Sequence, residues 1–125
     1  MPKLSIGRFI FMQTIGRKGE NLAAEHLKGK GYEILEQNYR FKKSEIDLIC
    51  LDDDLLVFVE VKTRSSRAFG EPESFVSDNQ KESILKAAER YMLDVDWKGD
   101  LRFDIVAIVY TNTEQEIMHL KDAFY

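Results

Sequence analysis

Three charged side chains in the middle of the chain have the types and the spacing that metal-dependent chemistry requires. Asp47 lies in a run where charged and apolar residues alternate, and Glu60 and Lys62 close a second run that is β-branched and aromatic. Both runs predict strands, in which successive side chains point to opposite faces. If these strands form a hairpin with Asp47 opposite Glu60, two carboxylates face each other with an ammonium group beside them.

Two opposed carboxylates destabilise a sheet unless something positive lies between them. A divalent cation fits this position, because Mg²⁺ binds one or two carboxylates together with water and substrate phosphate oxygens. The pattern therefore predicts a site for phosphodiester hydrolysis. A simpler hypothesis stays open, in which Asp47, Glu60 and Lys62 form an exposed ion-pair cluster of a structural or interaction domain. The spacing alone favours this simpler hypothesis.

The surrounding sequence predicts the elements that must position these residues. Helices are expected over residues 15–28 and from Ser77 to about Leu93, and Ser77 with Gln80 forms a capping-box pattern. Strands are expected at residues 32–36, on both sides of an acidic turn at 52–54, at 102–110 and at 116–120. The order αβββαββ predicts an α/β fold in which helices flank a mixed β-sheet.

The composition limits the class of protein. A chain of 125 residues suffices for one domain, which we expect over residues 14–125 after a loosely ordered segment at residues 1–13. The single cysteine, Cys50, cannot form an internal disulfide, and this favours a reducing cytoplasm. The longest apolar runs, residues 55–59 and 105–110, have the length of strands, so we expect no membrane span.

The charges are unevenly distributed along the chain. The net charge is −4, but residues 1–45 carry nine Lys or Arg against five Asp or Glu, whereas residues 71–125 carry six against twelve. Local potential governs phosphate binding more than the total charge does. Arg40, Lys42 and Lys43 are interleaved with aromatic residues, which suits a nucleic-acid backbone and its bases. An amphipathic strand end would carry the same residues.

Several motifs follow one another in a characteristic order over residues 14–124. Among them are Gly16-Arg17-Lys18-Gly19-Glu20, Glu45-Ile46-Asp47, Glu60-Val61-Lys62-Thr63-Arg64 and Arg102-Phe103-Asp104. Together they resemble the YraN family of uncharacterised bacterial proteins. That family is similar to the PD-(D/E)xK nuclease superfamily and to archaeal Holliday junction resolvases. The resemblance implies a restriction-endonuclease-like fold. Two positions depart from the family's pattern, since Ser44 replaces a common glycine and Gln80 replaces a common lysine.

The resemblance also implies roles for individual residues. Asp47 and Glu60 would hold Mg²⁺ or Mn²⁺ with the backbone carbonyl of Val61, and Glu20 would add a ligand directly or through water. Lys62 would complete the catalytic set by orienting the attacking water or neutralising developing charge. The expected nucleic-acid contacts are basic or amide side chains near this set: Arg17, Lys18, Arg40, Lys42, Lys43, Arg64, Arg67, Gln80 and Lys81.

The leading hypothesis is a metal-dependent DNA endonuclease, with branched or junction DNA as a candidate substrate. The alternative is a nucleic-acid-binding module that keeps the nuclease fold without turnover. A homodimer is a candidate assembly, because resolvases act as dimers. Serine, cysteine or histidine nucleophiles fit poorly, since His26 and His119 are not paired by sequence with Cys50 or with a Ser-Gly elbow.

Overall fold

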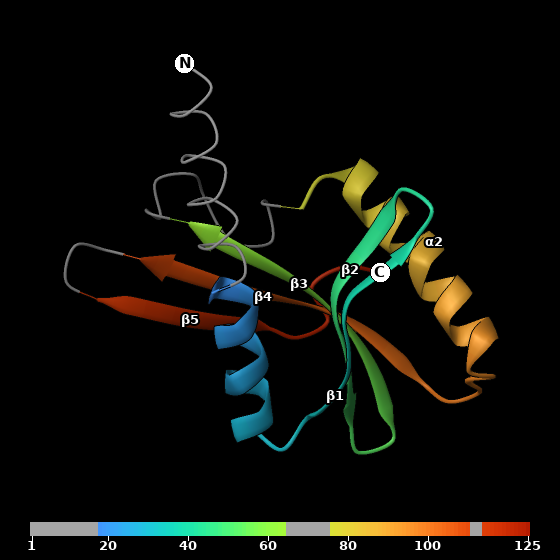
Figure 1. The fold of residues 1–125 in the computed structure, drawn as a ribbon, viewed down its shortest axis with the longest axis horizontal. Coiled ribbons are helices and arrows are strands. Elements are labelled where there is room, and N and C mark those ends of the chain that lie inside the picture. The colour runs from blue at the N-terminus through green and yellow to red at the C-terminus, as the bar shows by residue number, and fades with distance from the viewer. Residues whose placement is uncertain (1–17, 65–75, 111–113) are drawn as a thin grey trace, which may run out of the picture.

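The computed structural model describes residues 18–64, 76–110 and 114–125. Within these residues a helix over 18–29 is followed by five strands and a second helix. The expected order αβββαββ and the mixed α/β fold are confirmed (Figure 1). The elements, in chain order after the first helix, are β1 (Glu33–Phe41), β2 (Ser44–Asp52), β3 (Leu55–Arg64), α2 (Asp78–Asp94), β4 (Leu101–Tyr110) and β5 (Gln115–Leu120).

The sheet has the strand order β1-β2-β3-β4-β5. Neighbouring strands pair antiparallel except β3 and β4, which run parallel. A parallel pair needs a crossover connection, and α2 lies in the connection between these two strands. No helix in the described part of the chain is long and apolar enough to cross a membrane.

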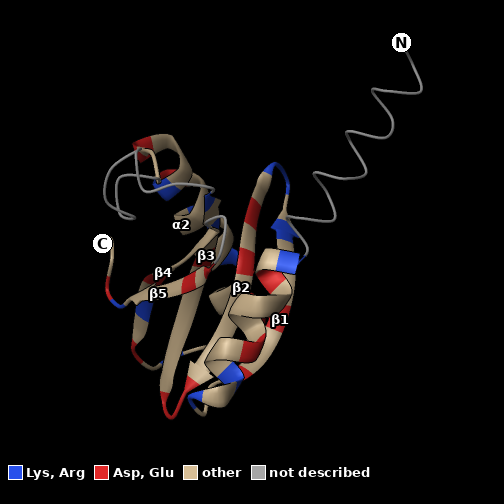
Figure 2. Cartoon of the chain, turned by 90° about the vertical axis from the view of Figure 1, so that its left-hand side faces the viewer, with Lys and Arg blue, Asp and Glu red and all other residues tan. Residues whose placement is uncertain are grey.

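The two helices cover opposite faces of the sheet (Figure 1, Figure 2). The first helix buries its small apolar stripe, Ala23, Ala24 and Leu27, against a cluster that includes Val57 and Val59. On the other face α2 packs its apolar stripe against aromatic and aliphatic side chains of the strands, among them Phe58, Phe103 and Ile105. Alternate residues of β3 thus enter different cores, as strand geometry requires.

β1 is longer than the sequence predicted, and it contains most of the basic and aromatic segment that follows residue 36. Its pairing with β2 continues to Phe41 opposite Ser44, which gives the backbone of residues 37–41 ladder partners. Asn38 bends this continuous strand with a φ of 56°, in the left-handed region that Asn tolerates better than most residues. This bend lies opposite Asp47, between the pairs Gln37 with Leu48 and Tyr39 with Ile46.

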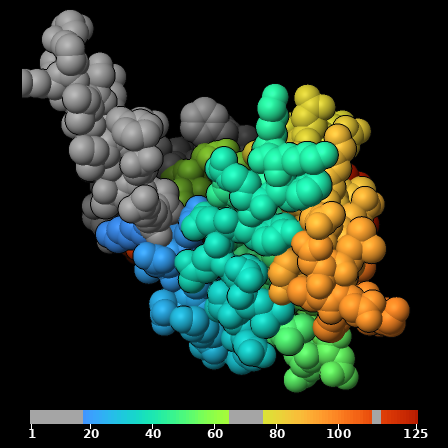
Figure 3. Space-filling model, turned by 45° about the vertical axis from the view of Figure 1, so that its right-hand side comes forward, coloured from blue at the N-terminus to red at the C-terminus, as the bar shows by residue number. Residues whose placement is uncertain are grey.

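The turn end of the β1–β2 hairpin separates from β3 and packs against α2 (Figure 3). The ladder between β2 and β3 runs from Asp52 opposite Leu55 to Leu48 opposite Val59. Beyond it, the Tyr39 ring lies edge-on to Tyr91 of α2, with centroids 5.2 Å apart. The Ser83 hydroxyl of α2 donates to Ser44 at 2.8 Å. The sheet therefore divides between β2 and β3, and this division creates the pocket described below.

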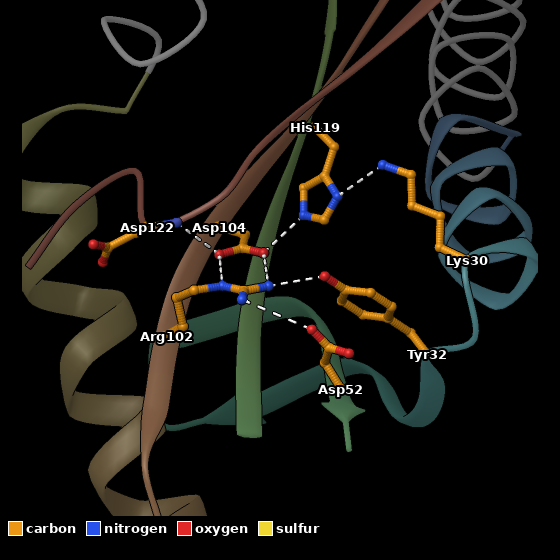
Figure 4. A network of polar contacts seen from close by, with 7 residues as sticks. All are labelled: Lys30, Tyr32, Asp52, Arg102, Asp104, His119 and Asp122. Atoms are coloured by element: carbon orange, nitrogen blue, oxygen red, sulfur yellow. Dashed lines mark hydrogen bonds and ion pairs between the residues drawn. The ribbon is translucent and has the colours of Figure 1, made fainter. Parts of the chain in front are cut away.

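A buried charge network joins the strands that are far from this division (Figure 4). The Asp104 side chain is fully buried. It receives two hydrogen bonds from Arg102, at 2.7 and 2.9 Å, and one from the backbone N–H of Asp122 at 3.0 Å. His119 Nε2 lies 2.7 Å from it. Arg102 also donates to the Tyr32 hydroxyl at 2.9 Å, so β4 is tied to β5, to the C-terminal turn and to the residue before β1.

The network lowers the pKa of Asp104. Burial alone would raise the pKa of this carboxyl, but the hydrogen bonds from His119, Arg102 and the Asp122 amide outweigh burial. Such a carboxylate stabilises the fold at pH values above its ordinary pKa, and the stabilisation is lost as the pH falls toward the lowered value. The network therefore contributes to stability at neutral pH.

Asp104→Ala is expected to lower the free energy of unfolding by about 3–5 kcal/mol, because it leaves the half-buried Arg102 without its main counter-charge. Urea unfolding at pH 7 measures this loss. The exposed Glu89→Ala on α2 is the matched control and should change stability by less than about 0.5 kcal/mol. An Asp104→Ala protein as stable as the control would contradict the structural role of the network.

Candidate functional site

A pocket of about 300 Å³ lies where β2 and β3 separate. β2 contributes Glu45 and Asp47, β3 contributes Glu60, and α2 forms the wall with Gln80, Ser83 and Ile84. Continuing the β2–β3 register by one residue beyond Leu48 and Val59 sets Asp47 beside Glu60. The structure thus brings together the two carboxylates that the strand pattern placed opposite each other.

Asp47 is held by the backbone of the neighbouring strand. Its Oδ2 accepts a hydrogen bond of 2.7 Å from the N–H of Val61. The residues on either side of Asp47 enter different cores, since Ile46 packs in the α2 cluster and Leu48 in the cluster of the first helix. Strict alternation would place both on one face. The bend at Asn38 and the departure of the hairpin explain why alternation fails here.

Burial, followed by the negative charge of Glu60, raises the pKa of Asp47 to about 8, although the Val61 amide opposes the rise. Burial also raises the pKa of Glu60, against the effect of Lys62, whose Nζ lies 3.3 Å from Glu60 Oε1. The two carboxyl groups are close enough for each to shift the pKa of the other. With a pKa of about 8, Asp47 is the carboxyl that favours its protonated form at neutral pH when no cation is bound.

Two further carboxylates approach Asp47. One oxygen each from Glu20, Glu45 and Asp47 lies within 4.8 Å of the other two. Glu20 comes from the first helix and was expected at the site, whereas the sequence reasoning gave Glu45 no role. Its position two residues before Asp47 in the alternating strand was the available signal. Glu45 also forms an ion pair of 2.8 Å with Arg40.

The donor set suits a hard divalent cation. Carboxylate oxygens are the ligands that Mg²⁺ and Mn²⁺ prefer, and no cysteine or histidine is among these donors. Two cations adjoin this group, since Lys62 Nζ lies 3.3 Å from Glu60 and Arg40 forms an ion pair of 2.8 Å with Glu45. The cluster of Glu20, Glu45 and Asp47 can therefore hold a metal ion. Glu60 lines the same pocket beside Asp47.

The expected nucleic-acid contacts are dispersed around the site. Gln80 lines the pocket and forms the predicted capping box with Ser77. Lys42 and Lys43 form the turn of the β1–β2 hairpin, and Figure 2 shows basic residues at the end of the hairpin beyond the acidic residues of β2. Arg64, at the end of β3, donates to the carbonyl of Thr63 at 2.9 Å.

Other predicted contacts lie away from the carboxylates or outside the described structure. The Lys81 ammonium lies 4.0 Å from Asp78 and 6.0 Å from the centre of the Phe124 ring, on the side of the C-terminal segment. The Lys18 ammonium lies 6.0 Å from the centre of the Tyr110 ring. Arg17 and Arg67 lie outside the described residues.

The fold and the pocket define an α/β protein with an acidic site between β2, β3 and α2. The profile of Uncharacterised protein family UPF0102 matches residues 19–108. The chain belongs to this family, which is the YraN family that its motifs resemble.

Relatives of similar length support this assignment. A UPF0102 protein of Christiangramia forsetii is 43% identical over 111 residues, which cover 89% of this chain and 93% of that protein. One of Flavobacterium psychrophilum is 45% identical with the same coverage. One of Alkaliphilus oremlandii is 43% identical over 117 residues, covering 90% of this chain and 98% of that protein. These names state no activity.

The stability of the metal-free protein should fall as the pH rises from about 4 to about 8. In this range the unfolded chain has released the proton of Asp47, whose ordinary pKa is 3.8, while the folded chain retains it up to about 8. The folded state then binds more protons than the unfolded state, so higher pH favours unfolding. Urea unfolding in EDTA across this range measures the slope.

Asp47→Asn is the informative variant, because it removes the titrating group and keeps an oxygen for the Val61 amide. It should flatten this part of the profile and be more stable than the wild type at pH 8, by roughly 1–3 kcal/mol. A wild-type protein whose stability rose over the same pH range would contradict the raised pKa of Asp47.

Proposed function

We propose that this protein is a metal-dependent nuclease that hydrolyses phosphodiester bonds in DNA. The observation that supports this most is the pair Asp47 and Glu60, which line one pocket where the β2–β3 ladder ends, with Lys62 Nζ 3.3 Å from Glu60. Two ionised carboxylates in one pocket repel each other, and this repulsion destabilises the fold unless a proton or a cation neutralises it. Perturbed groups of this kind in a cleft are candidates for a functional site.

Asp47 and Glu60 would hold Mg²⁺ or Mn²⁺, with the carbonyl of Val61 and with Glu20 as further donors. When bound, the ion would polarise the scissile phosphate and supply an acidic water molecule. Lys62 has a side chain only 14% exposed, so its ammonium group can act in a poorly hydrated environment. We assign it the role of orienting the attacking water or neutralising charge on the phosphate.

The hairpin turn and the end of β3 are the proposed contacts to the DNA backbone. Lys42, Lys43 and Arg64 lie at these two places, while Arg40 serves a second purpose by balancing Glu45. Branched DNA remains the candidate substrate on the basis of the resemblance to resolvases. A four-way junction, a nicked duplex and a linear duplex are therefore the substrates to compare.

The exposed ion-pair hypothesis fits the geometry poorly. The ion-pair hypothesis requires solvent-exposed side chains, whose salt bridges contribute little to stability. The side chains of Glu60 and Lys62 are only 11% and 14% exposed. The module without turnover differs from the nuclease in one measurable respect. It would bind DNA and the cation, and it would leave every phosphodiester bond intact.

Mg²⁺ or Mn²⁺ is expected to raise the melting temperature of the wild type, because the ion binds only the folded carboxylates. The gain is about 2.7 kcal/mol at a free ion concentration of about 100 times the dissociation constant. Asp47→Asn should lose both this increment and DNA cleavage. Lys62→Ala should keep the increment and lose cleavage, since its assigned work is on water and phosphate.

Calorimetry with each ion or EDTA, and cleavage of the three DNA substrates, provide the two readouts. The nuclease proposal would be wrong if neither ion changed the melting temperature of the wild type and the protein cut none of the three substrates. A metal-dependent increment without cleavage would favour the module without turnover.

Charge reversal of Lys42 and Lys43 together should weaken DNA binding. It should also reduce the log–log slope of affinity against salt by about one unit for each phosphate that the protein no longer touches. The melting temperature should change little, because both residues are exposed in a turn. Arg40 is left intact, since its reversal would place a second acid against Glu45. Lys98→Glu, beyond the C-terminal end of α2, is the control. Unchanged affinity in the double variant would place the DNA path elsewhere.

A further inference from the structure

A second hollow lies at the C-terminal end of α2. It has a volume of about 490 Å³, and it shares no lining residue with the acidic pocket. Its residues come from the last turns of α2, at the orange end of this helix in Figure 1, and from the segment that leads to β4. The lining residues, named here the Trp97 groove, are Glu89, Met92, Leu93, Asp96, Trp97 and Lys98.

The Trp97 groove is shaped by a defined helix cap. The N–H of Trp97 donates to the carbonyl of Met92 at 2.9 Å, and the N–H of Asp96 donates to that of Leu93 at 3.3 Å. Asp96 has a φ of 55°. These two bonds and a left-handed residue constitute a Schellman motif, in which the residue after the left-handed one packs against the last turn of the helix. Trp97 and Met92 occupy these two positions, so the groove is preformed.

The indole ring is fixed on its other side as well. Trp97 Nε1 donates to the carbonyl of Asp100 at 3.0 Å. A Cβ atom added to Gly99 would lie 3.0 Å from ring atom Cζ2, which is closer than ordinary contact distances. Glycine at this position therefore lets the backbone approach the ring. A ring held in this way loses little conformational entropy when a ligand binds.

Large apolar side chains remain exposed around the groove. Leu93 is 76% exposed and Val95 is 49% exposed. A single exposed leucine is ordinary on a protein surface. Here Leu93 and Val95 adjoin Met92 and Trp97 within six consecutive residues, and contiguous apolar patches mark interaction sites. Burial of these side chains against a partner would remove them from water.

The charged residues around the Trp97 groove indicate the charge of a partner that could bind there. From Glu89 to Asp100 the chain carries four acidic and two basic residues. Both bases are already engaged, Arg90 with Asp94 at 3.1 Å and Lys98 with Asp96 at 3.3 Å. Among the described contacts, Glu89 and Asp100 have no ion-pair partner. A nucleic acid would be repelled by such a rim, whereas Lys or Arg side chains would be attracted.

We propose that the Trp97 groove is a docking site for a protein segment that carries large apolar side chains next to Lys or Arg. The apolar side chains would pack on Trp97 and Leu93, and a cation would lie against Glu89. The groove and the acidic pocket are formed by opposite ends of α2, so a docked segment leaves the carboxylates accessible. The inference does not depend on the nuclease assignment.

Trp97 is the single tryptophan of the chain, so its fluorescence reports directly on the groove. The probe is a short synthetic peptide with the repeat Lys-Leu-Leu-Lys, titrated into the full chain at low salt. Saturable binding with a blue shift of the tryptophan emission is expected. Two control peptides replace either every Lys by Glu or every Leu by Ser. Both should bind at least about tenfold more weakly, since each lacks one half of the recognition.

Variants of the groove test whether the signal arises there. Leu93→Asp should weaken binding of the Lys-Leu peptide by roughly ten- to hundredfold, the loss expected when one buried leucine is removed from an interface. Its exposure in the isolated chain means that the fold should be retained, which circular dichroism checks. Glu89→Lys should also weaken binding. Glu82→Lys, an exposed reversal near the opposite end of α2, should not.

Three outcomes would overturn the proposal. They are equal binding of the acidic peptide, binding that Leu93→Asp leaves unchanged, and a blue shift that follows protein concentration without peptide. The last outcome, checked by analytical ultracentrifugation, would assign the groove to contact between copies of the chain.

Discussion

A hydrogen bond from the Val61 amide to the Asp47 carboxylate, 2.7 Å long, lies where β2 parts from β3. An amide at the end of a sheet ladder must find another acceptor or water. Asp47 supplies that acceptor, so β3 continues along β4 while the β1–β2 hairpin turns toward α2. The pocket exists because two strands that pair over most of their length are separated at this point. The residue that ends the pairing is also the central carboxylate of the site.

Charges within the protein offset part of the acidity of Glu45 and Glu60, because Arg40 forms an ion pair with Glu45 and Lys62 Nζ lies 3.3 Å from Glu60. Burial raises the pKa of both Asp47 and Glu60, so protonation is favoured over ionisation at this pair. A proton and a divalent cation compete for the same carboxyl pair, because the ligands must be deprotonated to bind a metal. Occupancy by an ion should therefore increase with pH up to the raised pKa of Asp47, at about 8. The same arrangement that destabilises the empty fold would favour the binding of a cation in the proposed site.

The two clusters of charged residues in this protein differ in how far they are satisfied. Both oxygens of Asp104 are occupied by donors from Arg102, His119 and the Asp122 amide, and the pKa of this carboxyl is lowered. Within the described residues, Asp47 receives one donor, the Val61 amide, and Glu60 lies beside Lys62, and the pKa values of both carboxyl groups are raised. A satisfied buried carboxylate stabilises a fold, whereas an unsatisfied pair is available to a ligand. The direction of the pKa shift separates a structural network from a candidate site.

Local sequence patterns determined much of this structure. The alternating residues around Asp47 and the β-branched run before Glu60 predicted the strands, and a short turn between them allowed few registers. For this reason the approach of Asp47 to Glu60 and the position of Lys62 could be predicted from spacing. The capping box of Ser77 and Gln80 was likewise predictable, because its bonds join residues within one helical turn.

Tertiary packing decided the rest. The approach of Glu20 to Asp47 requires the first helix to be placed against the division of the sheet, and no local pattern encodes that placement. The contact between Lys30 and His119 joins residues 89 positions apart. Alternation also misplaced Ile46 relative to Leu48, because the period of two assumes a regular strand and the chain bends opposite Asp47. Periodicity specifies which residues are buried, whereas the packing of helices on a bent sheet specifies which distant side chains meet.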